Sequence, residues 1–293
     1  MLAPQVSTRI TLNNILFATD FSQVSRAALP YARALAEWYG AKIFITHAVG
    51  PEPYLGMPLE PVPMQFDLFW KDAKRRLAEF VSASSFGDIA HEEILQHGEV
   101  WDVISSLVEK KDIDLLVVGT HGRHGLKKLV VGSEAEKIFR QAQCPVLTVG
   151  PGVADFTRKS WKLENVLFPT DFSETSLHAL PYALSLAEEN EATLIFLHIV
   201  PMVPWQQREA VEKSTRKRLE ALMPAEPWCK PEFSVGFDFP AEGILRFAQE
   251  READLIVMGV AKPAAVAWKT HMPGSVASEV VGGAQCPVLT VRR

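Results

Sequence analysis

Residues 115–133 read LLVVGTHGRHGLKKLVVGS, and the chain is best understood outward from this stretch. Residues 115–118 predict a buried strand, because the apolar run is too short for a helix and ends at Gly119. A basic loop with further glycines follows, and Gly132 and Ser133 then begin a run with helical spacing. Backbone N–H groups approach a phosphate closely where no Cβ intrudes, and a helix N-terminus adds free donors. The spacing Gly-x2-Gly-x9-Gly-Ser therefore predicts a phosphate-binding loop.

The chain contains the same unit twice. The repeated segments are NNILFATDFS at 13–22 and ENVLFPTDFS at 164–173, ALPYARALAE at 28–37 and ALPYALSLAE at 179–188, and QCPVLTV at 143–149 and again at 285–291. Two copies in 293 residues fit two domains of roughly 150 residues each. We predict a first domain at 1–150 and a second at 151–293, with a linker containing Gly, Pro and charged residues at 150–163.

Within each copy, runs typical of strands alternate with runs typical of helices. The first copy has expected strands at 13–18, 42–48, 91–96, 115–118 and 145–149, and expected helices at 23–39, 67–84, 99–110 and 133–141. Continuous apolar strands between helices indicate a parallel sheet with helices on both faces, a Rossmann-like α/β fold. In such sheets a ligand binds beyond the carboxyl ends of the strands, where we expect Asp20, Val49 and Gly119 to meet.

Composition and charge argue against several classes of protein. Hydrophobic residues make up 47% of the chain and charged residues 22%, as in an ordinary soluble globular protein. The formal net charge of -5 argues against non-specific binding to nucleic acid or to an anionic membrane. No run approaches the roughly 18 apolar residues of a membrane span, and residues 1–14 lack the layout of a signal peptide. Three scattered cysteines indicate a reducing compartment, so we expect a cytoplasmic protein.

The candidate binding residues also fit plain structural roles. Gly and Ser form turns and helix caps as well as phosphate sites. Asp20 and Asp171 fit a helix start, or hydrogen bonding to a ribose hydroxyl or an adenine edge, and the two roles can coexist. Neither GxxxxGK[ST] nor a GxGxxG after the first strand is present, which argues against a P-loop ATPase and a dinucleotide dehydrogenase. Cys144 and Cys286 precede Pro and are expected to be packed thiols rather than nucleophiles.

The histidines do not form a metal site in the sequence. His47 and His198 lie within strand patterns and are expected to be structural. His121 and His124 lie in the loop, where a phosphate contact and plain solvent exposure are equally good interpretations. No cluster has metal-ligand spacing, although a Mg2+ that arrives with a nucleotide would need only one or two protein ligands.

Two further stretches carry no clear chemistry. Residues 212–220 read EKSTRKRLE and predict a solvated helix face, because acidic residues lie three or four positions from the basic ones. Residues 51–66 are rich in Pro and absent from the second copy. They predict an insertion loop, which is either a lid or partner surface or merely tolerated length.

Taken together, these features resemble the universal stress protein family in its two-domain form. The shared features are the tandem repeat, the openings ILFATDFS and VLFPTDFS, the His-x-Val after the second strand, the Gly-x2-Gly-x9-Gly-Ser loop and the closing CPVLTV. The resemblance implies five-stranded parallel sheets of order 3-2-1-4-5, pairing of the domains through the last strand, and a homo-oligomer such as a dimer. It also implies an ATP site in the first domain, with Mg2+ as a possible companion. The implied ATP-binding residues are Asp20, Val49, Val118, Gly119, Gly122, Arg123, Gly132 and Ser133.

The second copy departs from the family pattern in its loop, GVAKPAAVAWKTHMPGS. Lys262 stands in place of the second glycine, and eleven residues rather than nine separate it from Gly274. A non-Gly residue in the left-handed region costs roughly 1–2 kcal/mol, and Pro263 favours extended backbone at Lys262. A rearranged site that uses the Lys262 or Lys269 ammonium stays open. The residues of this second candidate site are Asp171, Val200, Met258, Gly259, Gly274 and Ser275.

Three functions are compatible with the sequence. The leading prediction is a stress-response protein that binds ATP and uses its occupancy to alter contacts with a protein partner. The enzyme alternative is slow ATP hydrolysis, in which Arg123, Lys127 or a loop histidine stabilises transferred charge. The third is a structural or interaction module that binds no nucleotide. The family resemblance favours a binding and signalling protein with weak or no hydrolysis.

Overall fold

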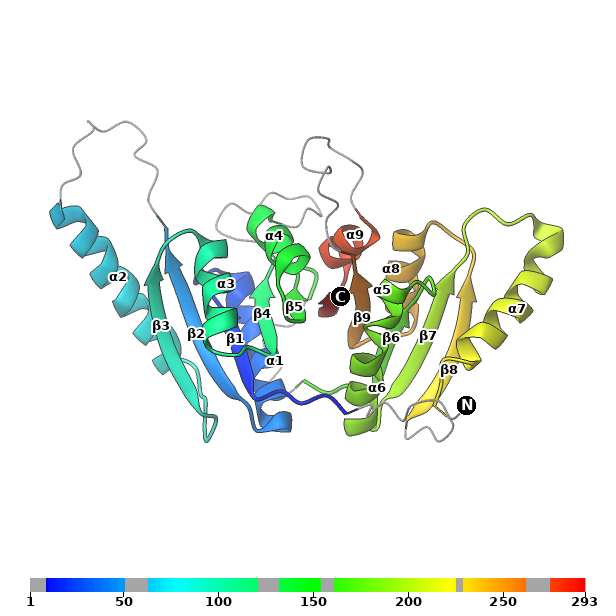
Figure 1. Cartoon of the computed structure of the whole chain (residues 1–293), viewed down its shortest axis with the longest axis horizontal. Helices are drawn as coiled ribbons and strands as arrows, with labels where there is room; N and C mark the ends of the chain where they lie inside the picture. Colours follow the sequence, from blue (N-terminus) through cyan, green and yellow to red (C-terminus); the bar gives the residue numbers. More distant parts are fainter. Residues whose placement is uncertain are drawn as a thin grey trace, which may run out of the picture.

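The computed structural model describes residues 9–50, 63–120, 132–153, 161–224, 229–261 and 275–292. The chain folds into two α/β halves that share one ten-stranded sheet (Figure 1). The first half contains strands β1 (Asn14–Ala18), β2 (Lys42–Val49), β3 (His91–His97), β4 (Leu115–Gly119) and β5 (Val146–Val149), and helices α1 (Gln23–Tyr39), α2 (Pro63–Ser82), α3 (Val100–Lys110) and α4 (Ser133–Gln141). These bounds confirm the expected strands and helices of the first copy to within a few residues.

The second half repeats this order with small differences. It contains strands β6 (Asn165–Pro169), β7 (Thr193–Ile199), β8 (Lys230–Gly236), β9 (Leu255–Val260) and β10 (Val288–Arg292), helices α5 (Glu174–Leu177), α6 (Leu180–Glu189), α7 (Arg208–Glu220), α8 (Pro240–Glu250) and α9 (Val276–Gly283), and a short 3-10 helix, η1 (Trp205–Gln207). The helix that corresponds to α1 is divided here into α5 and α6, whereas α1 runs without a break through Pro30. Pro181 lies in the first turn of α6, where its missing N–H costs no helical hydrogen bond.

The strand order is β3-β2-β1-β4-β5-β10-β9-β6-β7-β8. Each half therefore has the order 3-2-1-4-5 with parallel neighbours, as the family resemblance implied. The halves meet where β5 and β10 pair antiparallel, with Leu147 opposite Leu289. Two buried threonines reinforce this junction. Thr148 Oγ1 donates to the Val288 carbonyl at 3.0 Å, and Thr290 Oγ1 donates to the Val146 carbonyl at 3.2 Å.

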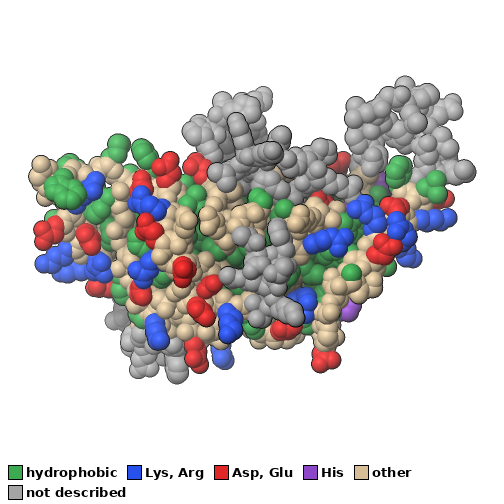
Figure 2. All heavy atoms as spheres, turned by 180° about the vertical axis from the view of Figure 1, so that it is seen from behind, with side chains coloured by type: hydrophobic (Ala, Val, Ile, Leu, Met, Phe, Trp, Pro, Cys, Tyr) green, Lys and Arg blue, Asp and Glu red, His purple; other side chains and the backbone are tan. Residues whose placement is uncertain are grey.

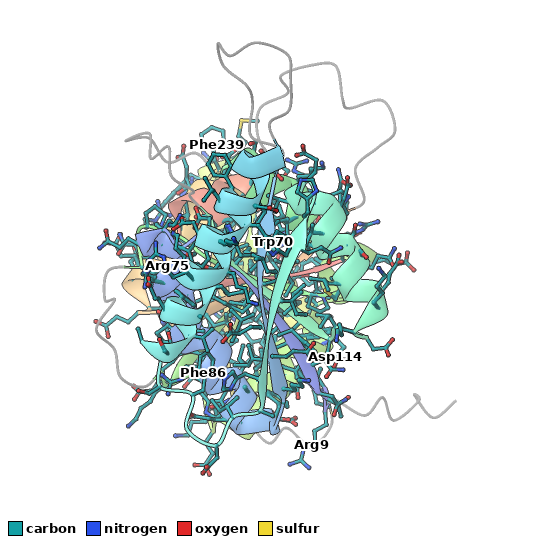
Figure 3. The ribbon with its side chains drawn as sticks, turned by 90° about the vertical axis from the view of Figure 1, so that its left-hand side faces the viewer. Arg9, Trp70, Arg75, Phe86, Asp114 and Phe239 are labelled. Carbon is teal, nitrogen blue, oxygen red and sulfur yellow. The ribbon has the colours of Figure 1, made fainter. Side chains whose placement is uncertain are left out.

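Helices cover both faces of the sheet. Figure 3, which looks at the β3 edge, shows α2 on one side of the strands and α3 on the other. Successive strand residues point to opposite faces, so Ile15 and Phe17 join one apolar layer and Leu16 joins the other. The first layer packs against α1, α2, α6 and α7, and the second against α3, α4, α8 and α9. Because each layer contains residues of both halves, the hydrophobic core continues across the β5–β10 junction.

In two expected connecting segments, the described residues belong to the core or to a helix. The predicted linker at 150–163 is described at 150–153 and 161–163, and in it Trp161 is buried against Tyr31 and Trp38 of α1. Burial of a large indole is favourable even when the residue lies in a connecting segment, and here it attaches the linker to the first half. The predicted loop at 51–66 also ends early, because 63–66 belong to α2, which begins at Pro63. Residues 51–62 lie outside the described part of the chain.

The surface of the described residues is mixed in charge. Figure 2 shows acidic and basic side chains interspersed over the back of the molecule. Of the helices formed by described residues, none combines the length and the apolar character needed to cross a membrane.

Candidate functional site

The first candidate residues lie where β1 ends and α1 begins. Asp20 is half-buried, and its Oδ1 accepts a hydrogen bond from the Ser22 N–H at 2.9 Å. Ser22 is the N-cap of α1, and its hydroxyl accepts from the Ser25 N–H at 3.2 Å. The helix cap that the sequence suggested for Asp20 is thus supplied by Ser22, and Asp20 shapes the turn before it. A carboxylate has about four acceptor positions, so this turn leaves Asp20 able to accept from a ligand hydroxyl.

An aromatic ring holds the turn that carries Asp20. Phe21 has a left-handed backbone, with φ 64°, which is costly for a bulky residue. Its ring packs 4.3 Å from the His47 imidazole and 4.7 Å from the Arg76 guanidinium, both measured to the ring centroid. The Thr19 carbonyl lies 2.7 Å from His47 Nδ1, and because a carbonyl only accepts, this nitrogen carries the proton. His47 therefore has a structural role, because it supports the turn that carries Asp20.

The second half repeats the same arrangement. Phe172 has φ 63°, its ring lies 4.8 Å from the His198 ring, and the Arg218 guanidinium lies 3.8 Å from its centroid. His198 Nδ1 donates to the Thr170 carbonyl at 2.7 Å. Arg218 belongs to the stretch 212–220 that was predicted as a solvated face. It is exposed, but it also covers the Phe172 ring, so that interpretation was incomplete.

The ends of β2 and β4 bring further predicted residues to the same edge of the sheet. Val49 ends β2, and its carbonyl accepts from the Gly98 N–H at 3.0 Å. Val118 is buried and pairs with Ala18, the last residue of β1. Gly119 follows, and a Cβ there would lie 2.9 Å from the backbone nitrogen of Ser25. Gly119 thus has a packing role, since only glycine lets the end of β4 approach the start of α1 this closely.

The start of α4 leaves its N-terminus without a side-chain cap. Gly132 is the N-cap residue, and its N–H donates to the Thr120 carbonyl at 2.8 Å. A Cβ on Gly132 would lie 3.0 Å from that carbonyl oxygen, so the approach is close. Ser133 is the first helical residue and is exposed. The first turn of α4 therefore presents backbone N–H groups and one exposed hydroxyl at the edge where β4 ends.

The corresponding helix of the second half begins differently. Ser275 is the N-cap of α9, and its hydroxyl accepts from the Ser278 N–H at 3.3 Å. Ser275 Oγ also accepts from the Arg140 guanidinium of the first half at 3.2 Å. The predicted phosphate ligand Ser275 is thus engaged within the protein, whereas its counterpart Ser133 is not a cap.

The remaining residues of the second candidate site are also accounted for. Asp171 Oδ1 accepts from the N–H of Ser173 at 2.9 Å and from its hydroxyl at 2.6 Å. Burial raises the pKa of Asp171, but these hydrogen bonds outweigh it and hold the pKa below its ordinary value. The other members follow strand ends as predicted: Val200 comes directly after β7, and Met258 and Gly259 lie in β9.

Several predicted site residues belong to the segments between β4 and α4 and between β9 and α9. Gly122, Arg123, His121, His124 and Lys127 lie outside the described residues, as do Gly274, Lys262 and Lys269. Within the described residues, no group of three or more His, Cys, Asp or Glu side chains is close enough to hold a metal ion. Cys144 and Cys286 are buried free thiols, in agreement with the packing role predicted for them.

Comparison of the chain with models of known protein families gives a match over both halves. The model of the universal stress protein family matches the chain twice, at residues 11–150 and 162–292. The chain belongs to the universal stress protein family. It carries two family units in tandem, as the internal repeat predicted. The boundary between domains at 150 and 151 stays a prediction.

Relatives match either one unit or the whole chain. A universal stress protein of Methanocaldococcus jannaschii is 33% identical over 137 residues, which cover 46% of this chain and 80% of the relative. A universal stress protein of Mycobacterium tuberculosis is 25% identical over 297 residues, which cover 95% of this chain and 96% of the relative. The crystal structure of a universal stress protein from Archaeoglobus fulgidus has a TM-score of 0.71 at 20% identity and covers 97% of this chain and 100% of its own. At that identity the likeness shows the fold.

Proposed function

We propose that the first half of the chain binds an adenine nucleotide, namely ATP with or without Mg2+. The observation that carries this proposal is the uncapped N-terminus of α4, which opens at the same sheet edge as the carboxylate of Asp20. A helix N-terminus favours phosphate, and a carboxylate suits a ribose hydroxyl or an adenine amino group. Strands β1 and β4 are neighbours in the sheet, so Asp20, which follows β1, and α4, which follows β4, come after adjacent strand ends.

Each predicted residue has a role in this proposal. Asp20 accepts a hydrogen bond from the nucleoside, and Val49 and Val118 provide apolar contacts beside it. The backbone N–H groups of the first turn of α4 and the Ser133 hydroxyl donate to phosphate oxygens. The loop residues Gly122 and Arg123, together with Gly119 and Gly132, complete the proposed set.

The second half is less suited to bind a nucleotide than the first. Ser275 is already engaged as a helix cap. Lys262 replaces a loop glycine, and the loop is longer. We therefore propose one nucleotide per chain, bound by the first half. Binding would alter contacts with a protein partner in a cytoplasmic stress response, and homo-oligomerisation stays part of this proposal.

Two matched variants test the site. Asp20→Asn keeps an oxygen that can accept from the Ser22 N–H, so the turn survives while the charge is lost. A lost charged hydrogen bond lowers affinity by about ten- to a hundredfold. Isothermal titration with ATP and Mg2+ should show this loss for Asp20→Asn, and a change within about twofold for the control Asp171→Asn.

Three results would count against the proposal. Nucleotide-stripped wild-type protein that releases no heat with ATP would refute nucleotide binding. An unchanged affinity in Asp20→Asn would remove Asp20 from the site. Equal losses in both variants would mean that the second half binds nucleotide as well.

A further inference from the structure

Helices α4 and α9 are counterparts in the two halves, yet their ends are stabilised in different ways. α9 has a side-chain cap at its N-terminus, supplied by Ser275. α4 has no side-chain cap there, and its N-cap residue is Gly132. An absent cap leaves backbone donors free for a ligand, but it also weakens the helix. α4 is only nine residues long and buries only Ala135, Ile138 and Phe139, so a helix of this length needs support from elsewhere.

The second half supplies that support at the other end of α4. The Arg292 guanidinium, at the end of β10, donates to the carbonyls of Arg140 and Ala142, each at 3.4 Å, and to the carbonyl of Gln141. These are carbonyls that a helix leaves without an internal partner, and a cation near them is favourable. Arg292 thus holds the last turn of α4 from across the junction between the halves.

A second set of contacts joins the side of α4 to the start of α9. Arg140 donates to Ser278 Oγ at 2.8 Å and forms an ion pair with Glu136 at 2.9 Å. The Ser278 hydroxyl donates to Glu136 Oε1 at 3.1 Å. Glu136 lies in the first turn of α4, where a carboxylate repels phosphate, and these contacts partly neutralise it. Figure 1 shows α4 and α9 as neighbours at the centre of the molecule.

We call Arg292, Ser275 and Ser278 of the second half, together with Glu136 and Arg140 of α4, the α4 clamp. The clamp has no mirror image. The repeated segment QCPVLTV starts at 143 and at 285, an offset of 142, so the counterpart of Arg140 is Gly282 and that of Arg292 is Gly150. Neither glycine has a side chain with which to hold α9. The contacts of Arg140 with Ser275 and Ser278 join the two helices in both directions, but only α4 has its last turn held by an arginine of the other half.

We propose that the second half regulates the nucleotide site of the first by holding α4 in the orientation in which its first turn meets the phosphates. This inference rests on the proposed nucleotide binding. A helix that is already ordered and correctly placed binds without a further ordering cost, whereas a loosened helix must be ordered at the moment of binding. Anything that displaces the clamp, such as a partner bound at the start of α9, lowers the affinity for phosphate-bearing ligands.

The clamp should affect ATP but not adenosine. Adenosine has no phosphates to reach α4, so its binding depends on the β1 and β2 ends rather than on the clamp. In Arg292→Ala, ATP affinity should fall by roughly three- to tenfold, while adenosine affinity stays within about twofold of wild type. Arg292→Lys retains a cation and should restore most of the loss. The control Arg75→Ala removes an exposed guanidinium of α2 that, among the described residues, forms ion pairs with Asp72 and Glu79 of the same helix, and it should change neither affinity (Figure 3).

Hydrogen exchange tests the clamp without any nucleotide. Arg292→Ala should speed amide exchange in α4 while leaving α3, which covers the same face of the sheet, unchanged. Unchanged exchange in α4, equal weakening of ATP and adenosine, or full ATP affinity in Arg292→Ala would each overturn the inference while leaving nucleotide binding intact. Wild-type protein that binds neither ligand would instead refute the proposed function, and with it the regulatory role of the clamp.

Discussion

Trp161 shows how one residue can fix the linker between two repeated units to the first unit. Its indole is 5% exposed, and its ring lies 5.0 Å from that of Tyr31 and 5.2 Å from that of Trp38. We expect Trp161→Ala to lower the free energy of unfolding by about 3–5 kcal/mol, because a buried aromatic ring is replaced by a cavity. Urea denaturation measures this change. Trp205 is 77% exposed, so Trp205→Ala should cost less than about 0.5 kcal/mol. Similar losses in both variants would contradict the anchoring role of Trp161.

The buried thiols make a prediction about alkaline stability. Burial raises the pKa of Cys144 and of Cys286 from 9.0 to about 12. The unfolded chain releases these protons at a lower pH than the folded protein, so the free energy of unfolding falls as the pH rises from 9.0 towards about 12. Urea denaturation at several pH values should show a shallower alkaline loss in the double variant Cys144→Ala, Cys286→Ala. An identical slope in the variant and the wild type would show that the thiols do not titrate in this way.

The residues of the candidate site differ in how far the sequence could predict them. Asp20, Val49 and Gly119 follow apolar strands directly, so their place at the sheet edge follows from the pattern alone. The packing of Arg76 on Phe21 could not be predicted, because it joins α2 to a turn far away in the chain. The two copies do not even share the spacing, which is 55 residues from Phe21 to Arg76 and 46 from Phe172 to Arg218.

At the level of elements, the contact between β4 and α1 is sensitive to substitution. A Cβ on Gly119 would lie 2.9 Å from the Ser25 nitrogen and 3.0 Å from the Val24 carbonyl carbon, and backbone atoms cannot rotate away. Gly119→Ala should therefore cost about 1–3 kcal/mol of stability and weaken ATP binding, because the ends of β1 and β4 are pushed apart.

Gly50→Ala is the matched control for this prediction. The nearest atom to its added Cβ, the Gly98 carbonyl oxygen, lies 4.0 Å away, so thermal denaturation should show a loss below about 0.5 kcal/mol. A Gly119→Ala protein as stable as Gly50→Ala would show that the strand end can move to accept the methyl group.

The elements themselves were largely predictable, because apolar periodicity is a local property of the sequence. The errors fall where tertiary contacts decide. α2 extends back to Pro63 from the expected start at 67, and the helix after β6 is divided into α5 and α6 although its sequence resembles that of α1. The N-terminal caps of α4 and α9 also differ, although the sequence Gly-Ser stands at the start of both helices.

At the scale of the whole molecule, the repeat predicts two similar halves but not how unlike their roles can be. The strand order and the β5–β10 junction agree with what the family resemblance implied. The α4 clamp was not predictable from the repeat, because its key residues Arg140 and Arg292 correspond to glycines in the other copy. The two copies thus share one fold, and the differences between them determine which half we expect to bind the nucleotide.

The number of nucleotides per chain tests the central claim most directly. Native mass spectrometry of the protein, stripped of small molecules and then titrated to saturation with ATP and Mg2+, counts the bound nucleotides without assuming which residues bind. We predict one ATP for each chain at saturation, and, at an ATP concentration near the wild-type Kd, a much lower occupancy in Asp20→Asn and an unchanged one in Asp171→Asn. No bound nucleotide in the wild type would contradict nucleotide binding, and two per chain would contradict the assignment of a single site to the first half.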